Sequence, residues 1–141
     1  MILYLDASAL VKLYVEEPGS EAVAARVERA EAVVTVWVID AEARGALARH
    51  RREGALTVPA LRRAVRQLDG EWGTYNLVDV RNPVVRRAET LAERHALRGY
   101  DAVQLAAALD VRDAGAEIEF ACYDGRLARA ASRERLPLAA H

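Results

Sequence analysis

The sequence predicts an α/β fold, a parallel sheet of about four to five strands covered by about seven helices on both faces. Two sequence patterns and the length and composition of the chain support this prediction. Short apolar or β-branched runs alternate along the chain with longer segments of helical period. The first run, Ile2 to Leu5, has no polar face, which is typical of a strand buried on both sides. The 141 residues are 52% hydrophobic and 29% charged, enough for the core of one compact domain.

The individual elements are predicted from these periods and from the glycines and prolines between them. The expected strands are Ile2–Leu5, Ala32–Val36, Leu77–Val80 and Ile118–Tyr123, with Leu136–Leu138 as a short edge strand. The expected helices are Ala7–Glu16, Glu21–Ala30, Ile39–Glu53, Val58–Trp72, Pro83–Leu97, Asp101–Asp113 and Arg126–Ser132. Because strands and helices alternate, the strands are expected to run parallel.

The composition excludes several classes of protein. No apolar stretch approaches the roughly 18 residues needed to span a bilayer, and the first strand lacks the basic region and cleavage site of a signal peptide. The single cysteine, Cys122, rules out an internal disulfide and a thiolate metal cluster and fits a reducing cytoplasm. It falls in the last core strand, where a free thiol usually packs as a small hydrophobe.

The charges are balanced in number but not in kind. The chain has 20 Lys and Arg residues against 21 Asp and Glu, and a net charge of −1 does not mark a nucleic-acid-binding protein. Every one of these basic residues except Lys12 is arginine. Arginine suits phosphate recognition, but arginine enrichment also accompanies a GC-rich genome, and composition alone does not separate the two explanations.

Two carboxylates lie where predicted strands end. Asp6 comes directly after the first strand, and Asp124 follows the last core strand. Ligands of open parallel sheets bind beyond the carboxyl ends of the strands, so both residues are expected at the binding edge. Each also has an ordinary structural role open to it, Asp6 as a helix cap and Asp124 with Gly125 as a turn.

Glu42 is harder to explain as a structural residue. At helical spacing it shares a face with Ile39 and Ala46, and that face should point toward the core. A buried carboxylate costs several kcal/mol unless it is paired or binds a metal ion. Its neighbour Asp40, by contrast, can form an ordinary surface ion pair with Arg44 one turn later.

Asp101 is equally awkward, because it leads an almost wholly apolar helix and its structural role would be that of N-cap. A single explanation covers all four acids if they meet at one edge of the sheet. Carboxylates placed so near to one another repel each other and need cations to stabilise them. Oxygen ligands suit Mg²⁺ or Mn²⁺ rather than zinc.

The histidines show no ligand spacing and are expected at the surface: His50, His95 and His141.

Four stretches of the chain together carry a resemblance to a known family. They are Ile2–Tyr14 (ILYLDASALVKLY), Asp40–Leu47 (DAEARGAL), Gly99–Ala108 (GYDAVQLAAA) and Cys122–Leu127 (CYDGRL). In this order and spacing they resemble the PIN-domain nucleases and, within them, the VapC toxins of bacterial toxin–antitoxin pairs. The resemblance covers nearly the whole chain, so residues 1–141 are interpreted as one PIN domain.

The resemblance implies roles for the acidic residues. Asp6, Glu42, Asp101 and Asp124 look like the family's catalytic acidic quartet, with Ser8 as the small hydroxyl that supports the first aspartate. A Mg²⁺-dependent endoribonuclease, with Mn²⁺ as the alternative ion, would use metal-activated water on a phosphodiester. Asp6 and Asp101 are then the expected direct ligands, Glu42 a ligand or water-orienting base, and Asp124 a second-site or outer-shell acid.

The same resemblance implies a substrate and partners. We expect a structured RNA such as a tRNA or ribosomal RNA loop, a VapB-like antitoxin that covers the site, a homodimer and a cytoplasmic location. RNA near an acidic pocket needs positive charge, and the candidates for phosphate contact are Arg44, Arg49, Arg98 and Arg126. A solvated helix face is expected for Arg62, Arg63 and Arg66. Trp37 stands where such toxins often carry small or hydroxyl residues, and most aromatic residues are expected to pack in the core.

Other interpretations stay open at this point. An aspartate-dependent phosphotransferase also places Asp6 after the first strand, but it needs a lysine near the phosphoryl group. The only lysine, Lys12, lies inside the first predicted helix, and Glu42 is left unexplained. A PIN domain that only binds RNA or protein conflicts with the intact acids. A PIN nuclease of RNA maturation, rather than a toxin, would lack a neighbouring antitoxin gene.

Overall fold

The computed structural model describes residues 1–139. Four parallel strands form one sheet in the order β3-β2-β1-β4. Their bounds are β1 Ile2–Leu5, β2 Ala32–Val36, β3 Asn76–Val78 and β4 Ile118–Ala121. The parallel α/β prediction is confirmed. Within the described residues the expected edge strand is reduced to a single parallel bridge between Leu138 and Phe120.

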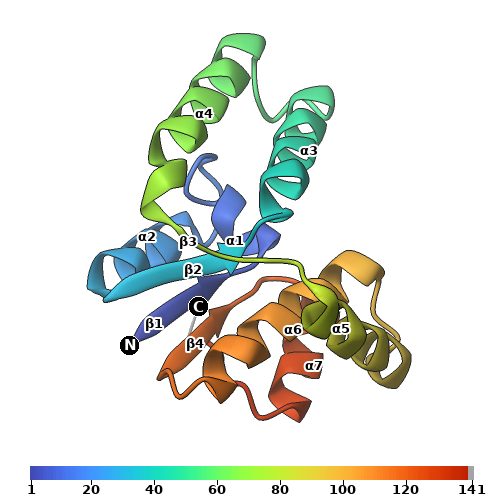
Figure 1. Ribbon diagram of the computed structural model, residues 1–141. Coiled ribbons are helices and arrows are strands. Elements are labelled where there is room, and N and C mark those ends of the chain that lie inside the picture. Colours follow the sequence, from blue (N-terminus) through green and yellow to red (C-terminus); the bar gives the residue numbers. More distant parts are fainter. Residues whose placement is uncertain (140–141) are drawn as a thin grey trace.

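Seven helices and one short 3₁₀ helix connect and cover these strands. They are α1 Ala7–Val11, α2 Ser20–Arg29, α3 Ile39–Arg52, α4 Val58–Glu71, η1 Trp72–Thr74, α5 Asn82–His95, α6 Gly99–Asp113 and α7 Gly125–Arg133. Figure 1 shows α1 to α4 on one side of the sheet and α5 to α7 on the other, with α3 and α4 rising away from the strands as a helical hairpin. The expected cover on both faces is therefore present.

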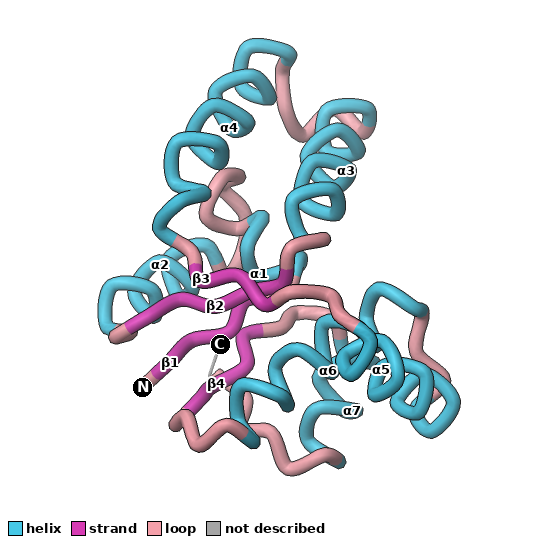
Figure 2. The backbone as a smooth tube through the Cα atoms, viewed as in Figure 1, coloured by secondary structure: helices cyan, strands magenta, loops and turns pink. Residues whose placement is uncertain are grey.

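The order of the strands decides where a ligand can bind. The chain moves outward from β1 through β2 to β3 and then returns, so that β4 pairs with the free side of β1 (Figure 2). Leu5 lies opposite Ala121 in this pairing. The connections leave β1 and β4 in opposite directions at this point, and such a switch opens a crevice at the carboxyl ends of the strands.

The core is built on β1 and α6. Leu3, Tyr4 and Leu5 are fully buried, as the unbroken apolar run predicts. The Tyr4 ring stacks on Phe120 of β4 with 5.4 Å between ring centroids. The buried part of α6 is almost entirely alanine and leucine, and its small side chains allow the helix to lie close to the sheet. No helix within residues 1–139 is long and apolar enough to cross a membrane.

The first helix is shorter than the sequence pattern predicts. It was expected to run to Glu16, but α1 ends at Val11. The next residues turn inward, because the Tyr14 hydroxyl donates to the Glu71 carboxylate at 2.7 Å and the Val15 carbonyl accepts from the Ser20 hydroxyl at 2.9 Å. These contacts outweigh local helix propensity.

The expectation that most aromatic residues pack in the core is confirmed for Tyr4, Tyr14 and Tyr75, which are buried, and Trp72 packs against the core. Trp37 is 51% exposed after the end of β2, where its ring meets the Trp72 ring edge-on. The surface location expected of His95 is wrong. Its side chain is 4% exposed and its Nε2 lies 2.7 Å from the Glu134 carboxylate. His141 lies outside the described residues.

Candidate active site

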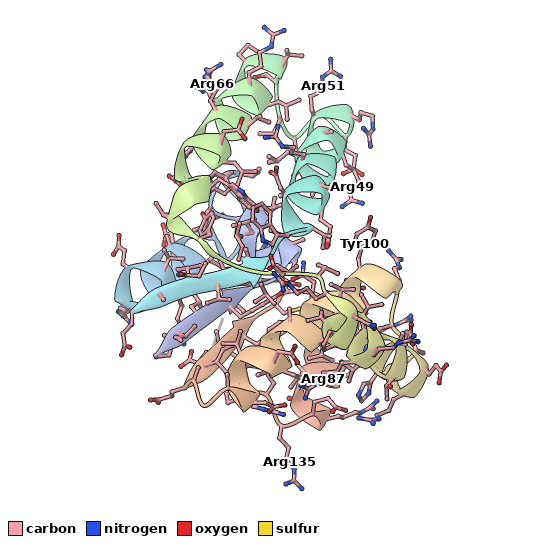
Figure 3. The ribbon with its side chains drawn as sticks, viewed as in Figure 1. Arg49, Arg51, Arg66, Arg87, Tyr100 and Arg135 are labelled. Atoms are coloured by element: carbon pink, nitrogen blue, oxygen red, sulfur yellow. The ribbon has the colours of Figure 1, made fainter. Side chains whose placement is uncertain are left out.

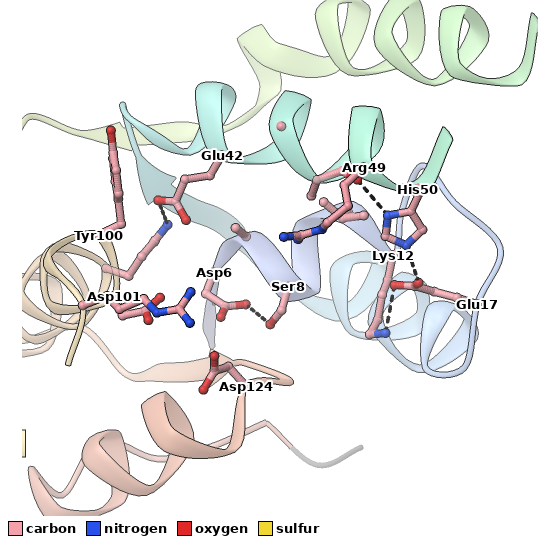
Figure 4. A pocket seen from close by; sticks show the side chains of 16 residues that line it. Asp6, Ser8, Lys12, Glu17, Glu42, Arg49, His50, Tyr100, Asp101 and Asp124 are labelled. Atoms are coloured by element: carbon pink, nitrogen blue, oxygen red, sulfur yellow. Dashed lines mark hydrogen bonds and ion pairs between the residues drawn. The ribbon is translucent and has the colours of Figure 1, made fainter. Parts of the chain in front are cut away.

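A pocket of about 570 Å³ opens at the carboxyl edge of the sheet, where α1, α3 and α6 meet the start of α7 (Figure 4). All four acids singled out in the sequence line it, although they are separated by up to 118 positions along the chain. The remaining lining is Ala7, Ser8, Val11, Lys12, Glu17, Gly45, Ala46, Arg49, His50, Arg98, Tyr100 and Gln104. The fold thus gathers carboxylates from four separate elements.

Asp6 serves as a helix cap and as a pocket residue at the same time. It is 3% exposed, and its Oδ1 accepts from the Ala9 backbone N–H at 2.9 Å and from the Ser8 hydroxyl at 2.7 Å. The Ser8 oxygen also accepts from the Tyr123 backbone N–H at 2.8 Å. Ser8 therefore ties the junction after β1 to the junction after β4 and fixes one carboxylate oxygen of Asp6.

Glu42 is oriented by a buried hydrogen-bonded chain. The Tyr4 hydroxyl donates to Gln104 Oε1 at 2.7 Å, and Gln104 Nε2 donates to Glu42 Oε1 at 3.1 Å. Gln104 is 1% exposed, so its amide has little freedom to turn. The surface pair expected for its neighbour is present, since Arg44 Nε donates to Asp40 Oδ1 at 3.1 Å.

The other two acids lie at the starts of helices. Asp124 is the N-cap of α7 and its Oδ1 accepts from the Leu127 N–H at 3.1 Å. The N-cap role considered for Asp101 is wrong. Helix α6 begins at Gly99 with Arg98 as N-cap, which places Asp101 in the first turn. Its carboxylate is therefore free of the capping role and faces the pocket (Figure 4).

The acids are electrostatically coupled. Burial raises the pKa of Asp6 to about 6, with the charge of Asp101 adding to the effect. Burial also raises the pKa of Glu42 to about 7, and the charges of Asp101 and Asp6 add to it. Burial and the charge of Asp124 raise the pKa of Asp101. The site is therefore a place where negative charge is costly and where a cation is stabilised.

The chemistry of the donor set fits a hard divalent cation. All four acids offer carboxylate oxygens, the ligands that Mg²⁺ and Mn²⁺ prefer. Within residues 1–139, no three His, Cys, Asp or Glu side chains are already arranged closely enough to hold one ion among them. Mg²⁺ commonly takes only one or two carboxylates and completes its shell with water and substrate phosphate, so a preassembled set of three is not required.

The candidate arginines divide into two groups. Arg49 and Arg98 line the pocket, and the charges of Arg98 and Arg126 act on Asp101 by lowering its pKa. Arg44 instead forms ion pairs with Asp40 and with Asp69 of α4, and it lies outside the pocket lining. Figure 3 shows Arg66 pointing outward from α4, as expected for a solvated face.

Sequence reasoning missed one cluster of pocket residues. His50, expected at the surface, lines the pocket together with Lys12 and Glu17. The Glu17 carboxylate lies 3.0 Å from Lys12 Nζ and 3.0 Å from His50 Nε2. The only signal in the sequence was the eight-residue spacing between Glu42 and His50, which places them near one helix face. Tyr100, 59% exposed beside Asp101, was also missed.

Comparison with known families identifies the domain. The profile of the PIN domain matches residues 3–132. The chain belongs to the PIN-domain family. This PIN domain is 39% identical over 126 residues to the ribonucleases VapC45 and VapC49 of Mycobacterium tuberculosis, and each match covers 89% of the chain and 86% of the relative.

Solved structures share the fold of this PIN domain at lower identity. FitAcB from Neisseria gonorrhoeae aligns with a TM-score of 0.70 and 19% identity over 99% of this chain and 97% of that one. The sarcin-ricin loop cleaving toxin VapC20 of M. tuberculosis aligns with a TM-score of 0.63 and 16% identity over 91% and 94%. A toxin–antitoxin complex from Klebsiella pneumoniae aligns with a TM-score of 0.59 and 14% identity over 86% of each chain.

Proposed function

We propose that this PIN domain is a metal-dependent endoribonuclease with Asp6, Glu42, Asp101 and Asp124 as its acidic centre. The observation that carries the proposal is the meeting of four carboxylates from four separate elements in one pocket, at the switch point of the sheet. The relatives that are 39% identical to it over 126 residues are named ribonucleases, which favours RNA as the substrate class.

The residues divide the work of hydrolysis between them. When bound, Mg²⁺ or Mn²⁺ lowers the pKa of a water molecule and offsets the charge on the transferring phosphate. Asp6 and Asp101 would hold the ion, and Ser8 and the Ala9 N–H keep the Asp6 carboxylate in place. Glu42 Oε1 is engaged by Gln104, so Oε2 is the oxygen left to orient water or to accept its proton.

The pKa of Glu42 suits that role. Its value of about 7 lies near neutral pH, where a general base is effective because about half of it is ionised and the carboxylate still takes up a proton readily. Asp124, at the exposed start of α7, would act from the outer side of the centre.

The biological role proposed is that of a VapC-type toxin acting in the cytoplasm on a structured RNA, held in check by a VapB-like antitoxin and assembled as a homodimer. The relatives carry VapC names, and one structure of the same fold is described as a toxin that cleaves the sarcin-ricin loop. Another is described as part of a toxin–antitoxin complex.

A phosphotransferase is disfavoured by the position of the only lysine. Lys12 Nζ donates to Glu17 at 3.0 Å and to the Pro18 carbonyl at 2.8 Å, and its side chain is 11% exposed. An ammonium group committed to two acceptors is poorly placed to neutralise a phosphoryl group on Asp6.

Cleavage of RNA by the purified protein tests the enzymatic proposal. With Mg²⁺ or Mn²⁺ the wild type should cut RNA, EDTA should abolish cutting, and Asp6→Asn should lower the rate by about 100-fold or more because a charged ligand is lost. Asp79→Asn is a matched control, since Asp79 follows β3 at the same edge, pairs with Arg81 and lies outside the pocket. Metal-independent cleavage, or equal loss in both variants, would refute the assignment.

The toxin role has a separate test. Induced expression should arrest growth, Asp6→Asn should not, and co-expression of a short neighbouring reading frame should relieve the arrest. An active nuclease that leaves growth unchanged would instead support RNA maturation.

A further inference from the structure

The pocket has a second end that the acidic centre does not use. Lys12, Glu17, Arg49 and His50 line it on the side of α1 and α3, away from Asp101 and Tyr100 (Figure 4). We propose that this end, called here the basic end and consisting of these four residues, binds an RNA phosphate next to the scissile one, with Arg49 as the contacting residue. The proposal rests on the proposed function, because it takes the scissile phosphate to lie at the acids.

Arg49 is placed for this contact by helix geometry. It lies seven residues after Glu42 on α3, so the two side chains share a helix face and are separated by roughly 10 Å along the axis. The side chain of Arg49 is exposed and points into the pocket between the acids and His50 (Figure 4). Among residues 1–139 its guanidinium makes no hydrogen bond or ion pair, and the planar fork of an arginine suits a phosphate.

The wall of the pocket between these positions is built from small residues. Gly45 and Ala46 line it, and a Cβ added at Gly45 would meet no atom within 4 Å. A chain of nucleotides can therefore pass along α3 from Glu42 to Arg49. The volume of about 570 Å³ exceeds what one phosphate needs, which leaves room for the adjoining nucleotide.

His50 and Lys12 supply further positive charge behind Arg49. The His50 Nδ1 lies 2.8 Å from the Ala46 carbonyl and its Nε2 lies 3.0 Å from Glu17. Both ring nitrogens face acceptors, which favours the doubly protonated, cationic form of the imidazole. The Ala46 carbonyl and the Glu17 carboxylate accordingly raise the pKa of His50.

The charges of the basic end add up in favour of an anion. Lys12 and Arg49 are cationic, the contacts of His50 favour its cationic form, and Glu17 is the one carboxylate among the four residues. The neighbouring Tyr123 ring lies 4.5 Å from Lys12 Nζ and helps to hold it. Lys12 and His50 are both held by Glu17, which leaves Arg49 to move onto a phosphate. This end thus offsets the repulsion that the acids exert on RNA.

Binding of RNA in the absence of metal tests the proposal without requiring cleavage. The probe is a short fluorescein-labelled oligouridylate, titrated in EDTA at several salt concentrations and followed by anisotropy. Arg49→Gln should weaken binding about five- to tenfold and make the slope of log K against log salt shallower by about 0.7, the value for one phosphate of a single strand. Arg49→Lys should restore most of the slope and part of the affinity.

Arg51→Gln is the matched control. Arg51 is an exposed arginine on the same helix, two residues further on, and lies outside the pocket lining (Figure 3). Its removal changes net charge equally and should alter the Kd by less than twofold. Equal effects of Arg49→Gln and Arg51→Gln, or no effect of either, would overturn the proposal.

Kinetics on a cleavable RNA give a second readout. With Mg²⁺, Arg49→Gln should raise KM about five- to tenfold and leave kcat nearly unchanged, because a flanking phosphate is bound alike in ground and transition states. If the wild type cleaves RNA and Arg49→Gln raises KM no more than Arg51→Gln does, the proposed phosphate contact of Arg49 is refuted and the proposed nuclease activity stands. If RNA binding depends on Arg49 but no RNA is cleaved, the nuclease activity is refuted and the phosphate contact stands.

Discussion

Helix α6 carries carboxylates at both ends, and the two ends are in opposite electrostatic situations. At the N-terminal end Asp101 faces other acids, and burial together with the charge of Asp124 raises its pKa. At the C-terminal end Asp110 and Asp113 lie 2.9 and 2.8 Å from Arg87 of α5. Hydrogen bonds from Arg87 and Arg112 lower the pKa of Asp113.

This contrast runs against the helix dipole. The dipole favours negative charge at the N-terminus of a helix and opposes it at the C-terminus. Neighbouring side chains reverse that preference at both ends of α6. The fold neutralises acids that serve structure and leaves those in the pocket in need of a cation, which is typical of a functional site.

The largest expected effect separates the two ends directly. Asp101→Asn should lower RNA cleavage by about 100-fold or more, because it removes the charge of a proposed metal ligand. Asp110→Asn should keep full activity and cost less than about 1 kcal/mol of unfolding free energy, as expected for a partly exposed ion pair. Cleavage rates and urea unfolding of both variants check this. Similar activities of the two variants would contradict the view that the two ends of α6 differ in function.

A second prediction concerns stability without metal. The raised pKa of Asp6 means that the native state keeps a proton between pH 4 and about 6 that the unfolded state has released. The free energy of unfolding therefore falls as pH rises through this window. Asp6→Asn keeps an oxygen acceptor for Ala9 and Ser8 and should be about 2 kcal/mol more stable than wild type at pH 8 in EDTA.

The same variant supplies its own control. Near pH 4 its advantage should disappear, and Mg²⁺ should stabilise the wild type much more than the variant. Urea denaturation at the two pH values checks this. If Asp6→Asn is less stable than wild type at pH 8, the buried charge of the Asp6 carboxylate does not lower the free energy of unfolding.

The third prediction addresses the chain from Tyr4 through Gln104 to Glu42. Gln104→Leu removes the donor that fixes Glu42 Oε1 and should lower kcat about tenfold with little change in KM, since Glu42 then samples unproductive orientations. Glu42→Gln in the same background should cause less loss than it does alone. Additive losses in this double-mutant cycle would show that Gln104 acts independently of Glu42.

The smallest expected effect concerns Gly45. A glycine inside a helix costs about 0.5–1 kcal/mol relative to alanine, and the space beside Gly45 is open. Gly45→Ala should therefore raise the free energy of unfolding by about that amount and alter cleavage by less than twofold. A tenfold loss of activity would mean that RNA passes closer to α3 than the basic end requires.

Much of the fold was predictable because its signals are local. The strands β1 and β2 have the bounds that their apolar runs predict, and helix α3 differs by one residue at its end. The four acids were identifiable because strand ends and helix faces can be read from spacing. Glu42, for which the sequence offers no ordinary structural role, was the most informative of them.

The rest depended on partners distant in the chain. Helix α1 ends early because Tyr14 bonds to a residue 57 positions away, and no local pattern encodes that contact. His50 reaches the pocket because Glu17, 33 positions earlier, turns toward it. Periodicity indicates which face of a helix is apolar. It does not indicate which distant polar side chains will contact that helix.

By itself, then, the sequence determined which segments form strands and helices and which carboxylates follow them, since hydrophobic period and turn residues act over a few positions. Only the tertiary structure decided that β4 lies beside β1, so that Ser8 meets the backbone of Tyr123 across 115 positions. It also decided that a basic end adjoins the acids. Strand order is set by packing of the whole core, and this pairing makes separate carboxylates into one site.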